Sequence, residues 1–78
     1  MWSSGTIWTE SKAGYDYWVK HFEEGSEFGI EQGRISKLTI RRHGDTKNIA
    51  NYDRGWDIEV PDDKQIKEVY AVLIKKYN

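Results

Sequence analysis

The sequence predicts an α+β domain in which a four-stranded antiparallel sheet carries one C-terminal helix packed on one face. Three observations predict it: a strand-like alternation over residues 34–42, a run of β-forming residues at Tyr15–Phe22, and an apolar stripe at helical spacing from residue 66 to 77. A length of 78 residues predicts a single domain spanning residues 1–78.

The segment Gly33–Arg42 contains the best-formed predicted strand. Its second half alternates between apolar and polar side chains, in the order Lys37, Leu38, Thr39, Ile40, Arg41. This alternation is typical of a strand with one buried and one wetter face. Ile35 is out of phase with it, so we expect either a β-bulge near Ser36 or an Ile35 side chain on the opposite face.

Three further strands complete the expected sheet, at Thr6–Thr9, Tyr15–Phe22 and Lys47–Arg54. The first two form a hairpin, and residues 47–54 should pair antiparallel with residues 34–42 because their connection is too short for a parallel crossover. Residues 1–4 are expected to fray, and residues 56–60 to end the sheet region. Glu23–Gly33 is an expected loop in which Phe28 and Ile30 tuck under the sheet.

The helix is expected to open at Pro61-Asp62. Asp62 is a favourable N-cap, and Gln65 follows three residues later, as in a capping box. Apolar side chains then recur at helical spacing, at Ile66, Val69, Tyr70, Leu73, Ile74 and Tyr77. The stripe predicts that this side of the helix packs against the sheet.

Composition limits the chemistry. With no cysteine, disulfides and thiolate zinc sites are excluded, and His21 and His43 have no ligand spacing. No cofactor or metal is expected, and no nucleophile, base and orienting group assemble in the sequence, so we expect no enzymatic activity. No long apolar run or signal peptide is present, which predicts a soluble, cytoplasmic protein without membrane contact.

Charge and aromatic content point to binding instead. The net charge is −1, yet residues 34–54 hold six Lys or Arg and two Asp. This local basic block is sufficient to bind a small anion or an acidic protein patch. General nucleic-acid binding usually needs a strongly basic domain, which this chain is not. Trp, Tyr and Phe supply 11 of 78 residues, more than one helix can cover, which indicates an oligomer interface or a ligand-stacking site. Because one helix covers only one face of the sheet, we expect a homodimer.

The expected ligand site centres on the run Tyr52-Asp53-Arg54-Gly55-Trp56-Asp57. Arg offers a planar donor fork to phosphate or carboxylate, and Trp offers a stacking plane. The predicted ligand-binding residues are Arg34, Lys37, Tyr52, Arg54, Trp56 and Asp57. The structural alternative is that Arg54 pairs with Asp53, Asp57 or a loop Glu, while Trp56 is a core residue.

Three stretches of the chain resemble a family of short proteins from Gram-positive bacteria and their phages, catalogued as a domain of unknown function. They are residues 19–30, residues 33–38 and residues 51–57, the last containing the Tyr-Asp-Arg-Gly-Trp-Asp run. The resemblance covers about residues 15–77. It implies a phage or prophage setting, hence a host-cell cytoplasm, but supplies no catalytic or binding residues.

Three functional hypotheses follow. The first is a non-enzymatic phage-type binding protein that acts as an anti-defence factor by sequestering a small nucleotide-like anion. The second is a protein–protein inhibitor of a host defence protein or nuclease, with Glu23, Glu24 and Glu27 as partner-binding residues. The third is a nucleic-acid-binding module in which aromatic side chains stack on bases beside the basic strand.

Overall fold

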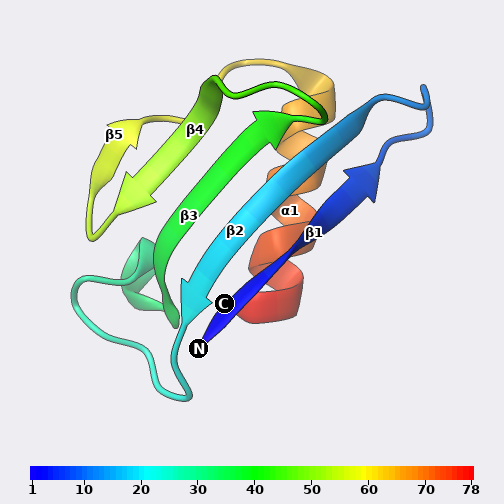
Figure 1. The fold of residues 1–78 in the computed structure, drawn as a ribbon. Helices are drawn as coiled ribbons and strands as arrows, with labels where there is room; N and C mark the ends of the chain where they lie inside the picture. The colour runs from blue at the N-terminus through cyan, green and yellow to red at the C-terminus, as the bar shows by residue number, and fades with distance from the viewer.

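The structure, a computed structural model, describes residues 1–78 as an antiparallel sheet with one helix behind it (Figure 1). The elements in order are β1 (Trp2–Trp8), β2 (Gly14–His21), the 3-10 turn η1 (Ile30–Gln32), β3 (Ile35–Arg42), β4 (Asn48–Asp53), β5 (Trp56–Ile58) and α1 (Lys64–Tyr77). The strands lie in the spatial order β1-β2-β3-β4-β5, and each pairs antiparallel with its chain neighbour. The predicted α+β class is confirmed.

The sheet has five strands, so the expectation of four was wrong. The extra strand is β5, a three-residue strand that pairs with Asn51 and Tyr52 of β4. A tight turn precedes it, in which the Asp53 N–H donates to the Gly55 carbonyl (2.8 Å) and Arg54 takes a positive φ of 56°. A strand this short carries too little alternation to be recognised from the sequence.

The first strand begins at Trp2, so the expected fraying of residues 1–4 was also wrong. Trp2 pairs with Lys20 and Trp8 with Gly14 at the two ends of the β1–β2 ladder. The Met1 amino group donates to the His21 carbonyl (3.0 Å), and the His21 N–H donates back to the Met1 carbonyl (2.9 Å). These two hydrogen bonds hold the start of the chain against β2.

The bulge expected near Ser36 is present. Lys37 pairs with Lys20 and Ile35 pairs with His21, which leaves Ser36 as the extra residue between them. The bulge restores Ile35 to the same face as Leu38, and both side chains are fully buried.

The helix begins at Lys64, with Asp63 rather than Asp62 as its N-cap. The Asp63 carboxylate accepts the backbone N–H of Gln65 (3.0 Å) and of Ile66 (3.1 Å). Asp62 instead pairs with Lys67 on the helix surface. The predicted stripe faces the sheet: Ile66, Val69 and Leu73 are buried, and Tyr70, Ile74 and Tyr77 pack at its margin.

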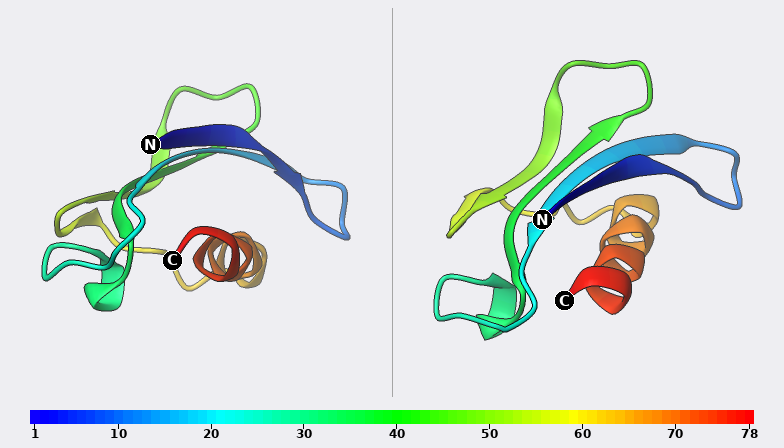
Figure 2. Two further views of the ribbon diagram at one scale, coloured as in Figure 1. Left: turned by 90° about the horizontal axis from the view of Figure 1, so that it is seen from below. Right: turned by 60° about the horizontal axis from the view of Figure 1, so that its bottom comes forward.

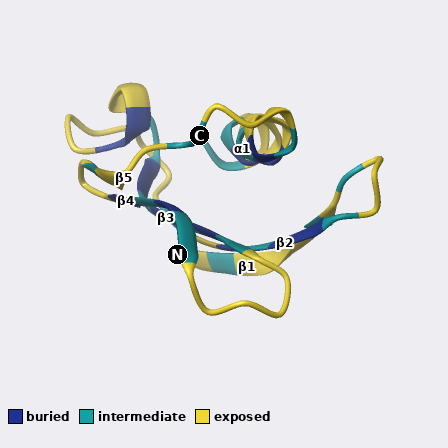
Figure 3. Cartoon of the chain, turned by 90° about the horizontal axis from the view of Figure 1, so that it is seen from above, coloured by how far each residue is buried: buried dark blue, intermediate teal, exposed yellow.

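The core lies between α1 and the concave side of the sheet (Figures 2 and 3). From the sheet and its loops it receives Tyr15, Tyr17, Val19, Ile30, Ile35, Leu38, Ile40, Ala50 and Tyr52. The loop expected at Glu23–Gly33 exists, but only Ile30 of its two apolar side chains is buried there. Phe28 remains 53% exposed, contrary to expectation. No helix is long and apolar enough to span a membrane.

The opposite side of the sheet, which faces the viewer in Figure 1, has no element over it, and we call it the open face. Its side chains are those that alternate with the core residues: Trp2, Ser4 and Thr6 of β1, Asp16, Trp18 and Lys20 of β2, Lys37, Thr39 and Arg41 of β3, and Asn51 and Asp53 of β4. The Arg41 guanidinium lies 5.0 Å from the Trp18 ring, near the middle of this face.

Candidate ligand-binding site

Two of the six residues predicted to bind a ligand belong to the core side of the sheet. Tyr52 is 7% exposed, and its ring lies 5.0 Å from that of Trp56, which in turn lies 5.8 Å from Tyr70 on the helix. The Tyr52 hydroxyl donates to the Phe28 carbonyl (2.7 Å). These rings therefore support the fold, as the structural alternative anticipated for Trp56.

Asp57 and Arg34 do not line the pocket that contains Lys37 and Arg54. Asp57 is exposed on β5 and accepts a hydrogen bond from the Asn51 side chain (3.0 Å). Arg34 borders a shallow pocket with Met1, His21, Phe22 and Glu23. Of the six predicted residues, the structure brings only Lys37 and Arg54 together in one pocket.

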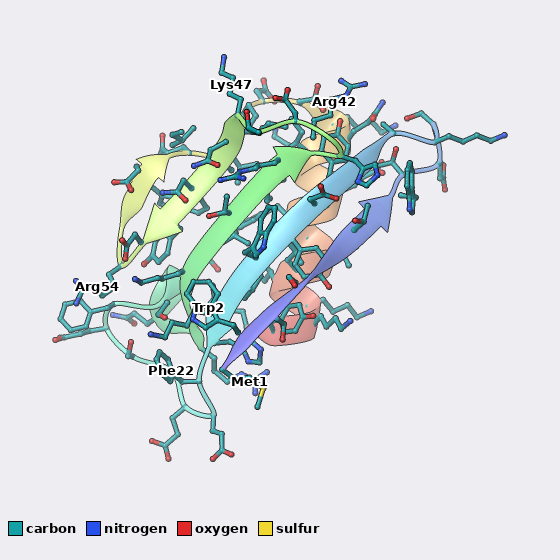
Figure 4. All side chains as sticks on the ribbon, in the orientation of Figure 1. Met1, Trp2, Phe22, Arg42, Lys47 and Arg54 are labelled. Atoms are coloured by element: carbon teal, nitrogen blue, oxygen red, sulfur yellow. The ribbon has the colours of Figure 1, made fainter.

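That pocket, which we call the basic aromatic pocket, has a volume of about 370 Å³. Four segments build it: the end of β2, the β2–β3 loop, the start of β3 and the β4–β5 turn. Its lining consists of Lys20, Phe22, Ser26, Phe28, Ser36, Lys37 and Arg54. In Figure 4, Arg54 and Phe22 lie at the end of the molecule that holds Met1, while Arg42 and Lys47 lie at the far end.

Chemistry, rather than size, distinguishes this pocket. Two other hollows of about 390 and 450 Å³ occur, one beside Arg34 and one on the outer face of α1. Both have a carboxylate in their lining, Glu23 in the first and Asp62 and Glu68 in the second. The basic aromatic pocket has three cations and no carboxylate in its lining.

The cations of the pocket are only weakly neutralised. Asp53, just outside the lining, lies 3.7 Å from Lys37 Nζ and 3.9 Å from Arg54 Nε. Both pairs are longer than a hydrogen bond and exposed to solvent, so each contributes little. Lys20 forms no ion pair; its Nζ lies 5.6 Å from the Phe22 ring and 5.9 Å from the Trp2 ring. An incoming anion would therefore displace few existing contacts.

Hydrogen bonds connect the segments that carry these side chains. The Arg54 N–H donates to the carbonyl of the bulged residue Ser36 (2.9 Å), which ties the β4–β5 turn to β3. The hydrogen bond from Tyr52 to the Phe28 carbonyl fixes the loop that presents the Phe28 ring. The Ser36 bulge therefore shapes both the core and the pocket.

Five lining residues were not predicted to belong to a site: Lys20, Phe22, Ser26, Phe28 and Ser36. A signal existed for two of them, because Lys20 and Phe22 share a face of the second predicted strand with Trp18. Nothing in the sequence indicated that the β2–β3 loop would fold toward that face and bring Ser26 and Phe28 there.

The residues proposed for a protein partner all lie on the exposed β2–β3 loop. Glu23, Glu24 and Glu27 are solvent-exposed, and none of them forms an ion pair. The loop therefore presents an acidic surface next to the basic aromatic pocket.

His21 has a nucleophile-type neighbour but no complete catalytic arrangement. Its Nε2 lies 3.0 Å from Ser3 Oγ, and its ring packs 4.8 Å from that of Tyr77. Burial, the terminal amino group and Arg34 together lower the pKa of His21, which favours the neutral imidazole. No carboxylate hydrogen-bonds to this ring to orient it as in a triad.

Fold and pocket together define a small α+β protein with an uncovered sheet face and a basic, aromatic hollow at one end of it. The chain belongs to the family described as Domain of unknown function (DUF7678), whose model matches residues 1–78. The resemblance to a family of unknown function is thereby confirmed. No curated protein and no solved structure matches the chain.

Proposed function

We propose that this protein is a non-enzymatic binding protein whose basic aromatic pocket takes a small anionic ligand carrying a flat ring, with nucleotides as the ligand class. The observation that carries the proposal is the pocket lining: three cations and two exposed phenyl rings, without a carboxylate. Arg and Lys satisfy phosphate oxygens, and phenyl rings offer stacking planes to a base.

The arrangement suits both parts of a nucleotide. Lys37 and Arg54 line the pocket from neighbouring segments and can contact the phosphate. The Phe22 and Phe28 side chains are 48% and 53% exposed, so their rings are accessible to a base. Exposed phenyl rings are unfavourable in water, so covering them with a base would add hydrophobic stabilisation to the phosphate contacts.

The proposal is tested by titrating the protein calorimetrically with AMP, adenosine and inorganic phosphate. We expect AMP to bind more tightly than either fragment, because only AMP carries both ring and anion. Arg54→Gln and Phe28→Ala should each weaken AMP binding by about tenfold or more, the usual effect of losing a charged hydrogen bond or a stacking plane.

Arg42→Gln is the matched control, because Arg42 is an exposed cation of the same sheet at the end away from the pocket. It should leave AMP binding unchanged. The proposal fails if AMP, ADP and ATP show no binding at millimolar concentration, or if both pocket variants bind AMP as the unchanged protein does.

A nucleic-acid module is the second candidate, favoured by the Trp18–Arg41 stack and by Trp2, which continue the aromatic and basic character over the open face. Binding of a thymidine oligonucleotide that weakens steeply with salt, with AMP not bound, would support this candidate instead.

The biological role is proposed from the phage or prophage setting. A phage protein in the host cytoplasm could oppose a defence system by sequestering a nucleotide signal, and it could alternatively inhibit a host protein through Glu23, Glu24 and Glu27. Reversing these three charges should abolish capture of such a protein partner and leave AMP binding intact.

A further inference from the structure

The two edges of the sheet differ in how well they are protected against pairing with another strand. The β5 edge is three residues long and carries Asp57. The β1 edge is seven residues long, Trp2–Trp8, and has neither a charged residue nor a proline. Edge strands of monomeric proteins are usually blunted by such residues or by shortness, because an open edge can pair with another strand. β1 has none of these protections.

The outward backbone groups of β1 follow from its pairing with β2. The Met1 carbonyl accepts from His21 N–H, and Thr9 N–H donates to the Ala13 carbonyl, both at 2.9 Å. Because hydrogen-bonded positions alternate along an antiparallel ladder, the odd-numbered residues face β2. The even-numbered residues therefore direct their N–H and C=O groups outward; they are Trp2, Ser4, Thr6 and Trp8.

Side chains leave this edge uncovered. The Trp2 ring lies beside Lys20 Nζ (5.9 Å), and the Trp8 ring lies 5.2 Å from that of His43. Thr6 Oγ1 donates to Asp16 Oδ1 (2.6 Å). All three side chains thus lean inward over β2 and its neighbours, and Figure 4 shows Trp2 over the sheet rather than beyond its edge.

We propose that β1 pairs antiparallel with β1 of a second copy, about a two-fold axis at Gly5, so that two sheets join into one. In this register Trp2 lies opposite the partner's Trp8, and Ser4 lies opposite the partner's Thr6. All seven residues overlap, and the outward groups meet as hydrogen-bonded pairs.

A second copy fits this edge because the strand is self-complementary. An uncharged strand brings no like charges together when it meets itself, whereas a charged foreign strand would find no complementary charge on it. The two-fold contact is closed, because it uses the β1 edge of both copies. The free edges of the joined sheet are then the two β5 strands, which are short and acidic and do not extend the sheet. The proposal is independent of ligand binding, because no residue of β1 lines the basic aromatic pocket.

Sedimentation equilibrium gives the first test. We expect a particle of twice the 9.2 kDa chain mass at micromolar concentration. Ser4→Pro removes an outward N–H without breaking a β1–β2 hydrogen bond, so it should yield a folded monomer. Circular dichroism and thermal unfolding of this variant check that the fold is intact.

Engineered cysteines test the register, and the chain has no cysteine to interfere. In the proposed pairing, the Cα atoms of Ser4 and the partner's Thr6 lie about 5.5 Å apart, within disulfide reach. The two Ser4 residues are offset by two positions and lie roughly 9 Å apart, beyond that reach. Mild oxidation of mixed Ser4→Cys and Thr6→Cys chains should therefore give a covalent dimer, whereas each variant alone should give little.

A protein that stays at 9.2 kDa from micromolar to millimolar concentration overturns the proposal. So does a dimer whose mixed cysteine variants form no disulfide, because that dimer uses another surface, such as the open face. If Ser4→Pro fails to fold, the cysteine experiment decides by itself.

Discussion

Replacing Asn78 by alanine should destabilise the fold far more than its partly exposed position at the end of α1 suggests. Its Oδ1 accepts the backbone N–H of Ile35 (2.9 Å), and its Nδ2 donates to the Ile30 carbonyl (3.2 Å). One side chain at the helix end therefore holds the β2–β3 loop and the first residue of β3.

The expected loss of stability follows from the burial of Ile35. Ile35 is fully buried and its hydrogen bond to Asn78 is partly buried, so the substitution would leave the Ile35 N–H without its protein partner. An unsatisfied buried backbone donor costs about 1–3 kcal/mol, and the free energy of unfolding should fall by about 2 kcal/mol. For a domain of this size, the melting temperature should then fall by roughly 8–16 °C.

Urea and thermal unfolding measure the loss, and hydrogen exchange locates it, because the Ile35 amide should exchange faster in Asn78→Ala. Lys75→Ala is the control, since Lys75 is exposed one turn earlier and forms no ion pair; it should change stability by no more than about 0.5 kcal/mol. An Asn78→Ala protein as stable as the Lys75→Ala protein would refute the reasoning.

Two further predictions concern the core and the open face. Leu73→Ala, at a fully buried position, should lower the free energy of unfolding by about 3 kcal/mol, whereas Val72→Ala, at a 47% exposed position, should change it little; chemical denaturation compares them. Thr6→Val should raise the pKa of Asp16, because hydrogen bonds from Thr6 and then His43 hold that pKa below its usual 3.8. The lowered pKa means that Asp16 stabilises the fold above its unfolded pKa and loses this contribution as the pH falls through its folded pKa. Carboxyl NMR titration checks the shift, with Asp62 as reference, because Lys67 rather than Thr6 lowers its pKa; an unmoved Asp16 pKa in Thr6→Val would count against the assigned hydrogen bond.

Local pattern was enough to predict the central strand and the helix stripe, and it offered the bulge as one of two explanations for the phase of Ile35. Each depends on the spacing of apolar residues within about a dozen positions. This spacing is a property of the local sequence and does not depend on the rest of the chain. The helix start was misplaced by one residue because Asp62 and Asp63 are both good caps; in the structure the Asp63 carboxylate accepts the Gln65 and Ile66 N–H groups. The β1 strand was underestimated because Trp2 is followed by Ser3, Ser4 and Gly5, which carry no strand pattern, and its hydrogen bonds come from β2.

The candidate site was predictable only in part. Lys37 and Arg54 were chosen for their chemistry and do share a pocket. Tyr52 and Trp56 were chosen with them, but one residue along a strand changes the face on which a side chain lies. Their side of the sheet depends on the register of β4 and β5 against β3, which no local pattern fixes.

By itself, the sequence determined the fold class, the apolar side of the helix and the concentration of positive charge in the middle of the chain, because these are properties of neighbouring residues. Only the tertiary structure decided three features. The β2–β3 loop brings Phe28 to Lys37 and Arg54, Asn78 holds this loop and the start of β3 by hydrogen bonds, and β1 keeps an uncovered edge. These outcomes depend on contacts between residues far apart in the chain, whose pairing is settled by how the whole core packs.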